Sequence, residues 1–375
     1  MVNKVKIKSL NLDEFRNYDS LHLEFNSQQN IFIGNNGSGK TNILEAISFL
    51  SPGRGLRRTS YSDVTRIGSP MLFSACANIE GMEGSADILI KLESKDDKNV
   101  RRLKINDLNV RTIDELNNHL RVSWIIPAMD RIFSGPSVER RSLLDRMVLS
   151  FDPKHRRRMI DFDRLMRSRN RLISEEYFDT SWCNSIEIQM AKLGIDITIS
   201  RIKMIKKLSS TMTEYIEKEH FPHIELNLSG FLDNKFDKYY LELEQEYANI
   251  LLRNRKIDAI AGRTLIGPHR SDLIANYCDK HAKIDQASTG EQKIVLIGIF
   301  LSHAILIYNT TGFAPILLLD EIAAHLDEKR RNSLFQIITD IGSQTFITGT
   351  DKSIFSSINK SATFIYIANN KASYL

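Results

Sequence analysis

The segment Gly34-Asn-Asn-Gly-Ser-Gly-Lys-Thr41 constrains this chain more than any other, because it fits the pattern G-x-x-x-x-G-K-[ST]. It follows the apolar run 31–33, typical of a buried strand, and precedes apolar residues at helical spacing that end at Pro52-Gly53. A strand, a glycine-rich turn and a helix in this order direct backbone N–H groups and a helix N-terminus at a phosphate group. A chance glycine-rich turn is the alternative, and the flanking strand and helix make it the weaker one.

The motif therefore predicts a nucleotide-binding loop on an α/β sheet. Within it, Lys40 would neutralise the β- and γ-phosphates and Thr41 would offer its hydroxyl to Mg²⁺. The residues expected to contact the nucleotide are Gly34, Asn35, Asn36, Gly37, Ser38, Gly39, Lys40 and Thr41.

A second apolar run, Ile316–Leu319, ends in the two acids Asp320 and Glu321. A buried strand does not tolerate adjacent acids in its middle, so they must project from its carboxyl end, where ligands bind in open α/β sheets. Asp320 suits the coordination of Mg²⁺, and Glu321 suits polarising the attacking water. A charged cap at a strand end is the plain alternative, which the phosphate loop makes less favoured.

The segment Ser288-Thr-Gly-Glu-Gln-Lys293 precedes an apolar helix. A serine and a glycine before a helix form an N-cap and a second anion-binding helix terminus. The loop at 34–41 would already bind the γ-phosphate of this chain's own nucleotide. We therefore expect Ser288 and Gly290 to contact the nucleotide of another subunit.

The order of the remaining elements predicts an α/β domain interrupted by a helical one. Short strand-like runs between about 71 and 126, among them Val122–Ile126, predict an antiparallel sheet beside the nucleotide-binding core. Long charge-rich segments then read as helices at about 137–150, 154–176, 181–220 and 237–258. Strands return after Gly267, with buried parallel strands at 316–319, 345–347 and 363–367. The predicted boundaries give one domain from 1–130 and 262–375 and a helical insertion at 131–261.

Positive charge is concentrated in one segment. The chain has a formal net charge of +5, and the segment from Lys154 to Arg171 alone carries eight basic and two acidic residues, or +6. A solvated helix face is the usual fate of such a run, but Arg164, Arg167 and Arg171 share one face with no equivalent acidic stripe. Because guanidinium groups suit phosphate contacts, we expect DNA binding without base readout. The candidate DNA-binding residues are Arg156, Arg157, Arg158, Arg164, Arg167 and Arg171.

Cysteine usage and apolar runs favour a cytoplasmic protein. Cys76, Cys183 and Cys278 stand far apart, so neither a disulfide framework nor a zinc site is encoded. The N-terminal residues lack the apolar core of a secretory signal. The apolar stretch 294–308 is too short to span a bilayer and predicts a buried helix.

The combination of these motifs resembles the ABC-type ATPases. The Ser288 segment is similar to the ABC signature of chromosome-maintenance ATPases, Glu321 matches the catalytic glutamate, and Leu326-Asp327 matches the D-loop. Further motifs resemble the RecF family of bacterial recombination mediators over essentially the whole chain. They are Phe15-Arg-Asn-Tyr18, Arg140-Arg-Ser-Leu-Leu-Asp145, Gly267-Pro-His-Arg-Ser-Asp272 and Thr348-Gly-Thr-Asp351.

The resemblance implies an ABC-type head that takes ATP and Mg²⁺, closes as a homodimer on gapped or junction DNA, and opens on slow hydrolysis. It also implies RecR and RecO as partners in loading recombinase onto DNA. The 124–130 stretch lacks the glutamine of the ABC Q-loop, and Thr348-Gly-Thr350 replaces the switch histidine. Both departures favour slow hydrolysis.

Three other functions share parts of this pattern. A transporter's ATPase subunit has no use for the long insertion and its basic helix. A chromosome-condensing protein needs arms of hundreds of residues, whereas these helices extend only a few tens of Å at about 1.5 Å per residue. A DNA scaffold that binds ATP without cleaving it differs from an ATPase only in phosphate release.

Overall fold

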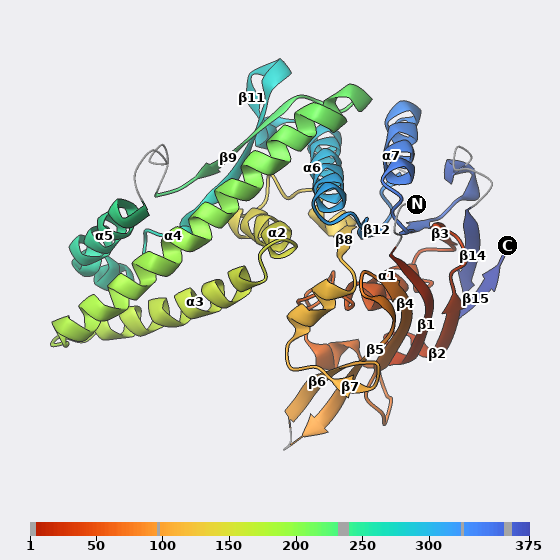
Figure 1. Cartoon of the computed structure of the whole chain (residues 1–375), viewed down its shortest axis with the longest axis horizontal. Coiled ribbons are helices and arrows are strands. Elements are labelled where there is room, and N and C mark those ends of the chain that lie inside the picture. Colours follow the sequence, from red (N-terminus) through yellow and green to blue (C-terminus); the bar gives the residue numbers. More distant parts are fainter. Residues whose placement is uncertain (1–4, 96–97, 232–239, 324–325, 356–361) are drawn as a thin grey trace. The chain divides into compact units, whose positions relative to one another are not determined.

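The computed structural model describes residues 5–95, 98–231, 240–323, 326–355 and 362–375. The chain separates into two compact units. The first contains residues 1–130, 214–221 and 293–375, and the second contains 131–213 and 222–292. In Figure 1 the first unit contains the two larger sheets, and the second contains the helices between residues 137 and 261.

The phosphate-loop motif lies on a mixed sheet of six described strands in the order β15-β14-β3-β13-β12-β8. All neighbours pair in parallel except β14 with β15. The predicted buried parallel strands are confirmed. The bounds are Gln29–Ile33 (β3), Val122–Ile125 (β8), Ile316–Leu319 (β12), Thr345–Gly349 (β13), Thr363–Ala368 (β14) and Lys371–Tyr374 (β15).

The prediction for Val122–Ile126 was wrong in one respect. We expected this run in the antiparallel sheet, but β8 pairs in parallel with β12 at the edge of the phosphate-loop sheet. All four of its residues are buried, which is typical of a parallel strand covered on both faces.

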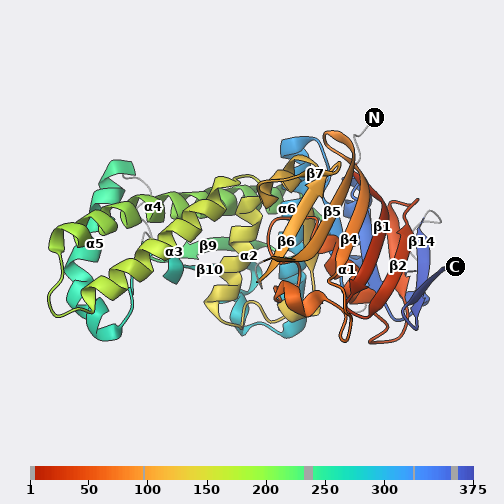
Figure 2. The same ribbon diagram turned by 90° about the horizontal axis from the view of Figure 1, so that it is seen from below.

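The second sheet of this unit is antiparallel, in the order β2-β1-β4-β5-β6-β7. Burial alternates along β1, β2 and β4, so one face packs on the core. There Phe15 and Phe73 meet Phe49, next to helix α1 (Lys40–Ser48), at ring distances of 5.9 and 6.1 Å. The strands are Lys6–Phe15 (β1), Tyr18–Glu24 (β2), Ser74–Gly81 (β4), Gly84–Lys95 (β5), Lys98–Ile105 (β6) and Leu108–Asn109 (β7). Figure 2 shows this sheet from below.

The second unit is built on four long helices (Figure 1). They are Ser137–Leu149 (α2), Lys154–Ile173 (α3), Thr180–Thr211 (α4) and Tyr240–Ala261 (α5). The helix expected over 181–220 ends at Thr211, and a π-helical turn at Met212–Ile216 follows it. The start of the helix expected over 237–258 lies outside the described residues before Tyr240.

The second unit also contains a three-stranded antiparallel sheet, which the sequence analysis missed. Its strands are Ile224–Ser229 (β9), Asp272–Tyr277 (β10) and Ala282–Lys283 (β11). We placed the end of the insertion at residue 261. In the structure, 262–292 belongs to the second unit, because β10 pairs with β9 along its whole length.

Helix α6 (Thr289–Thr311) contains the apolar stretch that we predicted to be a buried helix, and this is confirmed. Within the described residues it is the one helix long and apolar enough to span a bilayer, and 72% of its most apolar window is buried in the protein. Helix α7 (Glu328–Asp340) completes the regular helices of the first unit. Short 3-10 turns lie at Tyr61–Val64, Ile113–Asn118, Pro127–Met129, Glu217–Glu219, Pro268–Arg270, Cys278–Lys280, Ile284–Gln286 and Lys352–Phe355.

One residue of the basic segment holds the second unit together. Arg169 of α3 is fully buried and donates to Glu187 of α4 at 2.9 Å and to Asp258 of α5 at 2.7 Å. It also donates to the carbonyl of Leu251 at 2.7 Å. A buried charge is tolerated when its hydrogen bonds are made, so this arginine ties three helices together.

We predict that Arg169→Ala destabilises the protein by about 3–5 kcal/mol. The buried carboxylate of Asp258 would lose its cation, and Glu187 would keep only its pair with Arg255. Chemical denaturation with urea, followed by circular dichroism, measures this loss. The exposed neighbour Arg171 provides the matched control, since Arg171→Ala is expected to shift stability by less than about 0.5 kcal/mol. A loss below about 1 kcal/mol for Arg169→Ala would contradict the assigned role.

Candidate nucleotide site and basic helix

The phosphate loop requires glycine at the start of α1. Gly39 caps this helix with φ of +106°, and a Cβ there would lie 2.5 Å from Tyr18 Oη and 2.6 Å from Asn17 Nδ2. Gly37 also has a positive φ, of +81°, but a Cβ there would meet nothing within 4 Å. The loop is thus closed against β2 on one side and open on the other, which leaves room for a phosphate group.

The cation of the loop is held in place before any ligand binds. Lys40 is only 4% exposed, and its ammonium donates to the carbonyls of Gly34 at 2.7 Å and Asn35 at 2.9 Å. Burial lowers the pKa of Lys40, and the nearby carboxylates of Glu321 and Asp320 act in the opposite direction. The two carbonyl acceptors are neutral, so a phosphate bound beside Lys40 would place a negative charge next to the buried ammonium.

Three elements converge on the carboxylate of Asp320 at the carboxyl end of β12. Thr41 of α1 donates its hydroxyl to the two carboxylate oxygens at 3.0 and 3.1 Å. Thr348 at the end of β13 donates to Oδ1 at 2.7 Å. The structure therefore brings together the hydroxyl and the carboxylate that we assigned to the metal.

These donors fit Mg²⁺, which prefers hard oxygen ligands and one or two carboxylates together with phosphate oxygens. The hydroxyl of the neighbouring Ser38 is buried and has no hydrogen-bond partner within the described residues, as expected of a loop made to meet a polar ligand. Asp320 and Thr41 would hold the ion. No group of three or more His, Cys, Asp or Glu side chains in the described part of the chain forms another metal site.

Glu321 adopts an uncommon backbone conformation. Its φ is +53°, in the left-handed region that residues other than glycine rarely adopt. Its N–H donates to the hydroxyl of Thr348 at 2.9 Å. Thr348 therefore holds the carboxylate of Asp320 and the backbone of Glu321, a role that the sequence analysis did not predict.

Behind the loop, a buried carboxylate holds helix α1. Glu45 is fully buried and accepts from Arg16 at 2.6 and 2.8 Å and from Arg57 at 2.7 Å. Asn42 of the same helix donates to Asn17 at 2.6 Å. The Phe15-Arg-Asn-Tyr18 motif thus anchors the phosphate-loop helix. Sequence reasoning missed Glu45 and Arg57, and the available signal was an acid within an apolar helical face.

The segment expected to meet another subunit's nucleotide lies in the second unit. Ser288 is exposed, and its hydroxyl donates to Glu291 at 2.9 Å in a capping arrangement. This contact and the ammonium of Lys280 lower the pKa of Glu291 to about 2, with the lysine as the larger cause. A Cβ at Gly290 would meet nothing within 4 Å, so this helix start is open. The use of Ser288 and Gly290 on a nucleotide stays a prediction.

Several arginines of the basic helix α3 already form ion pairs within the protein. Arg157 and Arg164 both pair with Asp161, Arg167 pairs with Asp163, and Arg158 pairs with Asp152. Asp161 and Asp163, the two acidic residues in the charge count of this segment, therefore pair with three of its arginines. Exposed pairs of this kind contribute little and can exchange for phosphate, so DNA binding by this helix stays a prediction.

The comparisons with known proteins agree with this geometry. Residues 6–373 match the family model described as the RecF/RecN/SMC N terminal domain. The chain is 50% identical to the DNA replication and repair protein RecF of Rhizobium rhizogenes, with 98% of each chain covered. It is 48% identical to the RecF of Rhizobium meliloti, with 100% of each covered.

Solved structures share the fold. The structure of the recombination mediator protein RecF-ATP in the RecFOR pathway superposes with a TM-score of 0.88 at 22% identity, covering 100% of this chain and 99% of that one. The Smc head domain from Pyrococcus furiosus, bound to the C-terminal domain of ScpA, gives a TM-score of 0.55 at 17% identity, covering 99% and 96%. From the match of 6–373 and the near 50% identity over whole relatives, the chain belongs to the RecF family of DNA replication and repair proteins, among the ABC-type, SMC-like ATPases.

Proposed function

We propose that this protein is an ATP-dependent DNA repair mediator of the bacterial cytoplasm that dimerises on DNA when it binds ATP and releases DNA after slow hydrolysis. The observation that carries the proposal is that Thr41 and Thr348 both donate to the carboxylate of Asp320, with Thr41 directly following the buried Lys40 of the phosphate loop. The RecF structure bound to ATP, to which this chain is similar, supports the choice of ATP.

Different residues would bind the phosphates, hold the metal ion and activate the attacking water. The backbone N–H groups of 34–41 and the ammonium of Lys40 would bind and orient the β- and γ-phosphates. When bound at Asp320 and Thr41, Mg²⁺ would supply positive charge that stabilises the transferring phosphoryl group. Glu321, which follows Asp320 at the carboxyl end of β12, would accept a proton from the attacking water.

The open helix start at Ser288 supports a composite site. Its exposed hydroxyl and the unobstructed Gly290 would contact the γ-phosphate held by the loop of a second copy. Dimerisation would then depend on ATP. The exposed arginines of α3 would contact DNA phosphates, and the family membership supports RecR and RecO as the partners with which recombinase is loaded at gaps.

A scaffold that binds ATP without cleaving it is the competing function, and the presence of Glu321 directly after Asp320 favours hydrolysis. Phosphate release with and without gapped DNA decides between them. Hydrolysis that gapped DNA accelerates is expected. If phosphate release does not exceed that of a Lys40→Ala protein at any DNA concentration, the protein is a scaffold that binds ATP without cleaving it.

We predict that Glu321→Gln binds ATP with about wild-type affinity but accumulates as a closed dimer. The amide fits the same place, yet it is a poor proton acceptor. Size-exclusion chromatography with light scattering at saturating ATP measures the dimer, and phosphate release is expected to fall by at least about a hundredfold. Monomers alone at saturating ATP would contradict the prediction.

We predict that Ser288→Arg leaves ATP binding by the monomer intact and abolishes ATP-dependent dimerisation, since the larger side chain would obstruct the partner's γ-phosphate. Calorimetry measures the first property and light scattering the second. A matched control is Ser210→Arg, at an exposed position of α4. If Ser288→Arg dimerises like wild type, the composite site is wrong.

We predict that replacing Arg164, Arg167 and Arg171 with Gln flattens the salt dependence of DNA binding. Each lost phosphate contact lowers the magnitude of the slope of log K against log salt by about 0.9 on duplex DNA. Binding would weaken similarly for unrelated sequences, and ATP affinity would not change. Fluorescence anisotropy at several salt concentrations measures the slope.

An unaltered slope and affinity would move the DNA path to the antiparallel sheet, where a second basic cluster lies. Its members are Arg57, Arg58, Arg101, Arg102 and Lys104. That surface is the weaker candidate in the structure, because Arg57 is bound to Glu45, Arg101 to the carbonyl of Phe49 and Arg102 to Glu93.

A further inference from the structure

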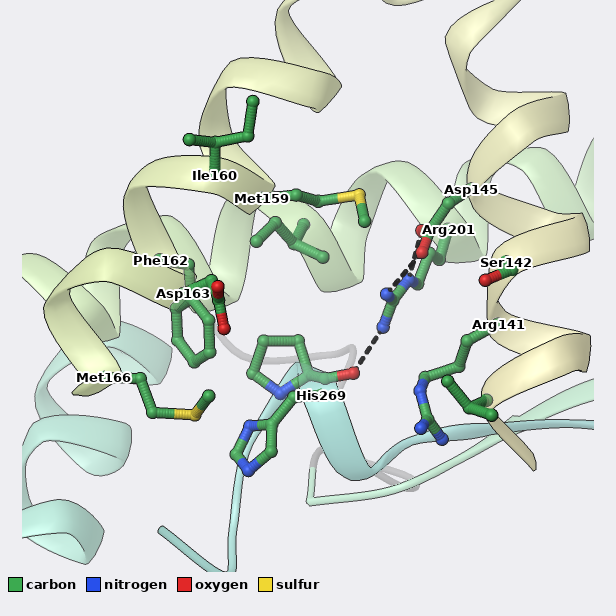
Figure 3. Close-up of a pocket in the computed structure, with 13 residues that line it drawn as sticks. Arg141, Ser142, Asp145, Met159, Ile160, Phe162, Asp163, Met166, Arg201 and His269 are labelled. Carbon is green, nitrogen blue, oxygen red and sulfur yellow. Dashed lines mark hydrogen bonds and ion pairs between the residues drawn. The ribbon is translucent and has the colours of Figure 1, made fainter. Parts of the chain in front are cut away.

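The second unit contains a cavity of about 380 Å³ that the nucleotide chemistry does not use (Figure 3). Helices α2, α3 and α4 and the turn Pro268–Arg270 form its walls. Two family motifs to which we assign no contact with the nucleotide, 140–145 and 267–272, both contribute residues to it. These residues are Arg141, Ser142, Asp145, Pro268 and His269.

One end of the cavity carries a cation whose charge is poorly compensated. The half-buried guanidinium of Arg141 donates to two neutral acceptors, the hydroxyl of Ser137 at 2.9 Å and the carbonyl of Ser271 at 2.7 Å. Burial and the nearby Arg201 lower its pKa, against the attraction of Asp272 and Asp145. A carboxylate entering the cavity would therefore gain from meeting Arg141.

The carboxylates near Arg141 are committed to other partners. Asp145 accepts from Arg201 at 2.8 and 2.9 Å and contacts His155 at 2.8 Å. Asp272 accepts two hydrogen bonds from Arg140, both at 2.7 Å. Asp163, which also lines the cavity, is paired with Arg167. Figure 3 shows the pair of Asp145 and Arg201 beside Arg141.

The opposite wall is apolar and adaptable. Figure 3 shows Phe162 and Met166 of α3 across the cavity from Arg141, with Met159 above them. Methionine side chains repack easily around different apolar groups. The apolar surface continues past the cavity, because Val138 is 54% exposed and Ile160 is 52% exposed. A ligand larger than the cavity would cover these two residues as well.

We propose that this cavity binds a short peptide segment of a protein partner, in which a carboxylate lies beside a large apolar side chain. The carboxylate would meet Arg141, and the apolar side chain would lie among Met159, Phe162 and Met166. DNA fits the cavity less well, since its walls are mostly apolar and a phosphate backbone requires a row of cations. This proposal does not depend on the proposed ATPase function, and peptide binding can be tested without ATP.

The test is selection from a phage-displayed random peptide library on the full-length protein, with counter-selection on Ile160→Glu. The enriched peptides are expected to carry Asp, Glu or a free C-terminus within two positions of Leu, Ile, Met or Phe. A synthetic fluorescent copy is expected to bind Arg141→Gln at least about tenfold more weakly, because a charged hydrogen bond is lost. It is expected to bind Ile160→Glu at least about tenfold more weakly as well, because the new carboxylate replaces an apolar contact and repels the carboxylate of the peptide. Binding to the matched control Arg164→Gln, which loses a charge on the outer face of α3, is expected to be unchanged.

Three results would overturn the proposal. They are the absence of any peptide that distinguishes wild type from Ile160→Glu, enriched peptides without a carboxylate, and undiminished peptide binding by Arg141→Gln. A loss of DNA affinity in Arg141→Gln without a peptide effect would instead assign the cavity to phosphate. Circular dichroism tests the fold of each variant. If Arg141→Gln fails to fold, Ile160→Glu still tests the proposal, because Ile160 is half exposed and its replacement is expected to leave the fold intact.

Discussion

The nucleotide site depends on one carboxylate that three elements share. Asp320 ends β12 and accepts hydrogen bonds from Thr41 of α1 and from Thr348 at the end of β13. Because these strands are neighbours in a parallel sheet, their carboxyl ends meet at one edge, and α1 begins at the same edge. The positions of the candidate metal ligand, the phosphate loop and the candidate water-activating Glu321 follow from this single junction.

The sequence predicted this junction well because each part is local. A glycine-rich turn between a strand and a helix, and two acids at the end of an apolar strand, have short-range signals that tertiary contacts do not override. The side chains behind it could not be predicted in the same way. Glu45 meets Arg16 and Arg57 only after β1, α1 and the segment after α1 have packed together.

The second unit shows why composition is a weaker guide than motif. The charge run of α3 is one pattern in the sequence, yet the structure gives its arginines three different environments. Arg169 is fully buried between two carboxylates, Arg158 lies against Asp152, and Arg164 and Arg167 remain exposed on pairs within the helix. The limit of the insertion was misplaced for a related reason, since the pairing of β9 with β10 joins segments more than forty residues apart.

The left-handed backbone at Glu321 has a consequence for which residues evolution retains at this position. Glycine or asparagine would occupy that conformation at lower conformational cost, so a glutamate there costs about 1 kcal/mol or more of stability. Once hydrolysis no longer mattered to a lineage, drift toward glycine or asparagine would be expected at this position. With the role in hydrolysis that we propose for Glu321, the residue at the matching position of a distant relative would then indicate whether that relative still cleaves its nucleotide.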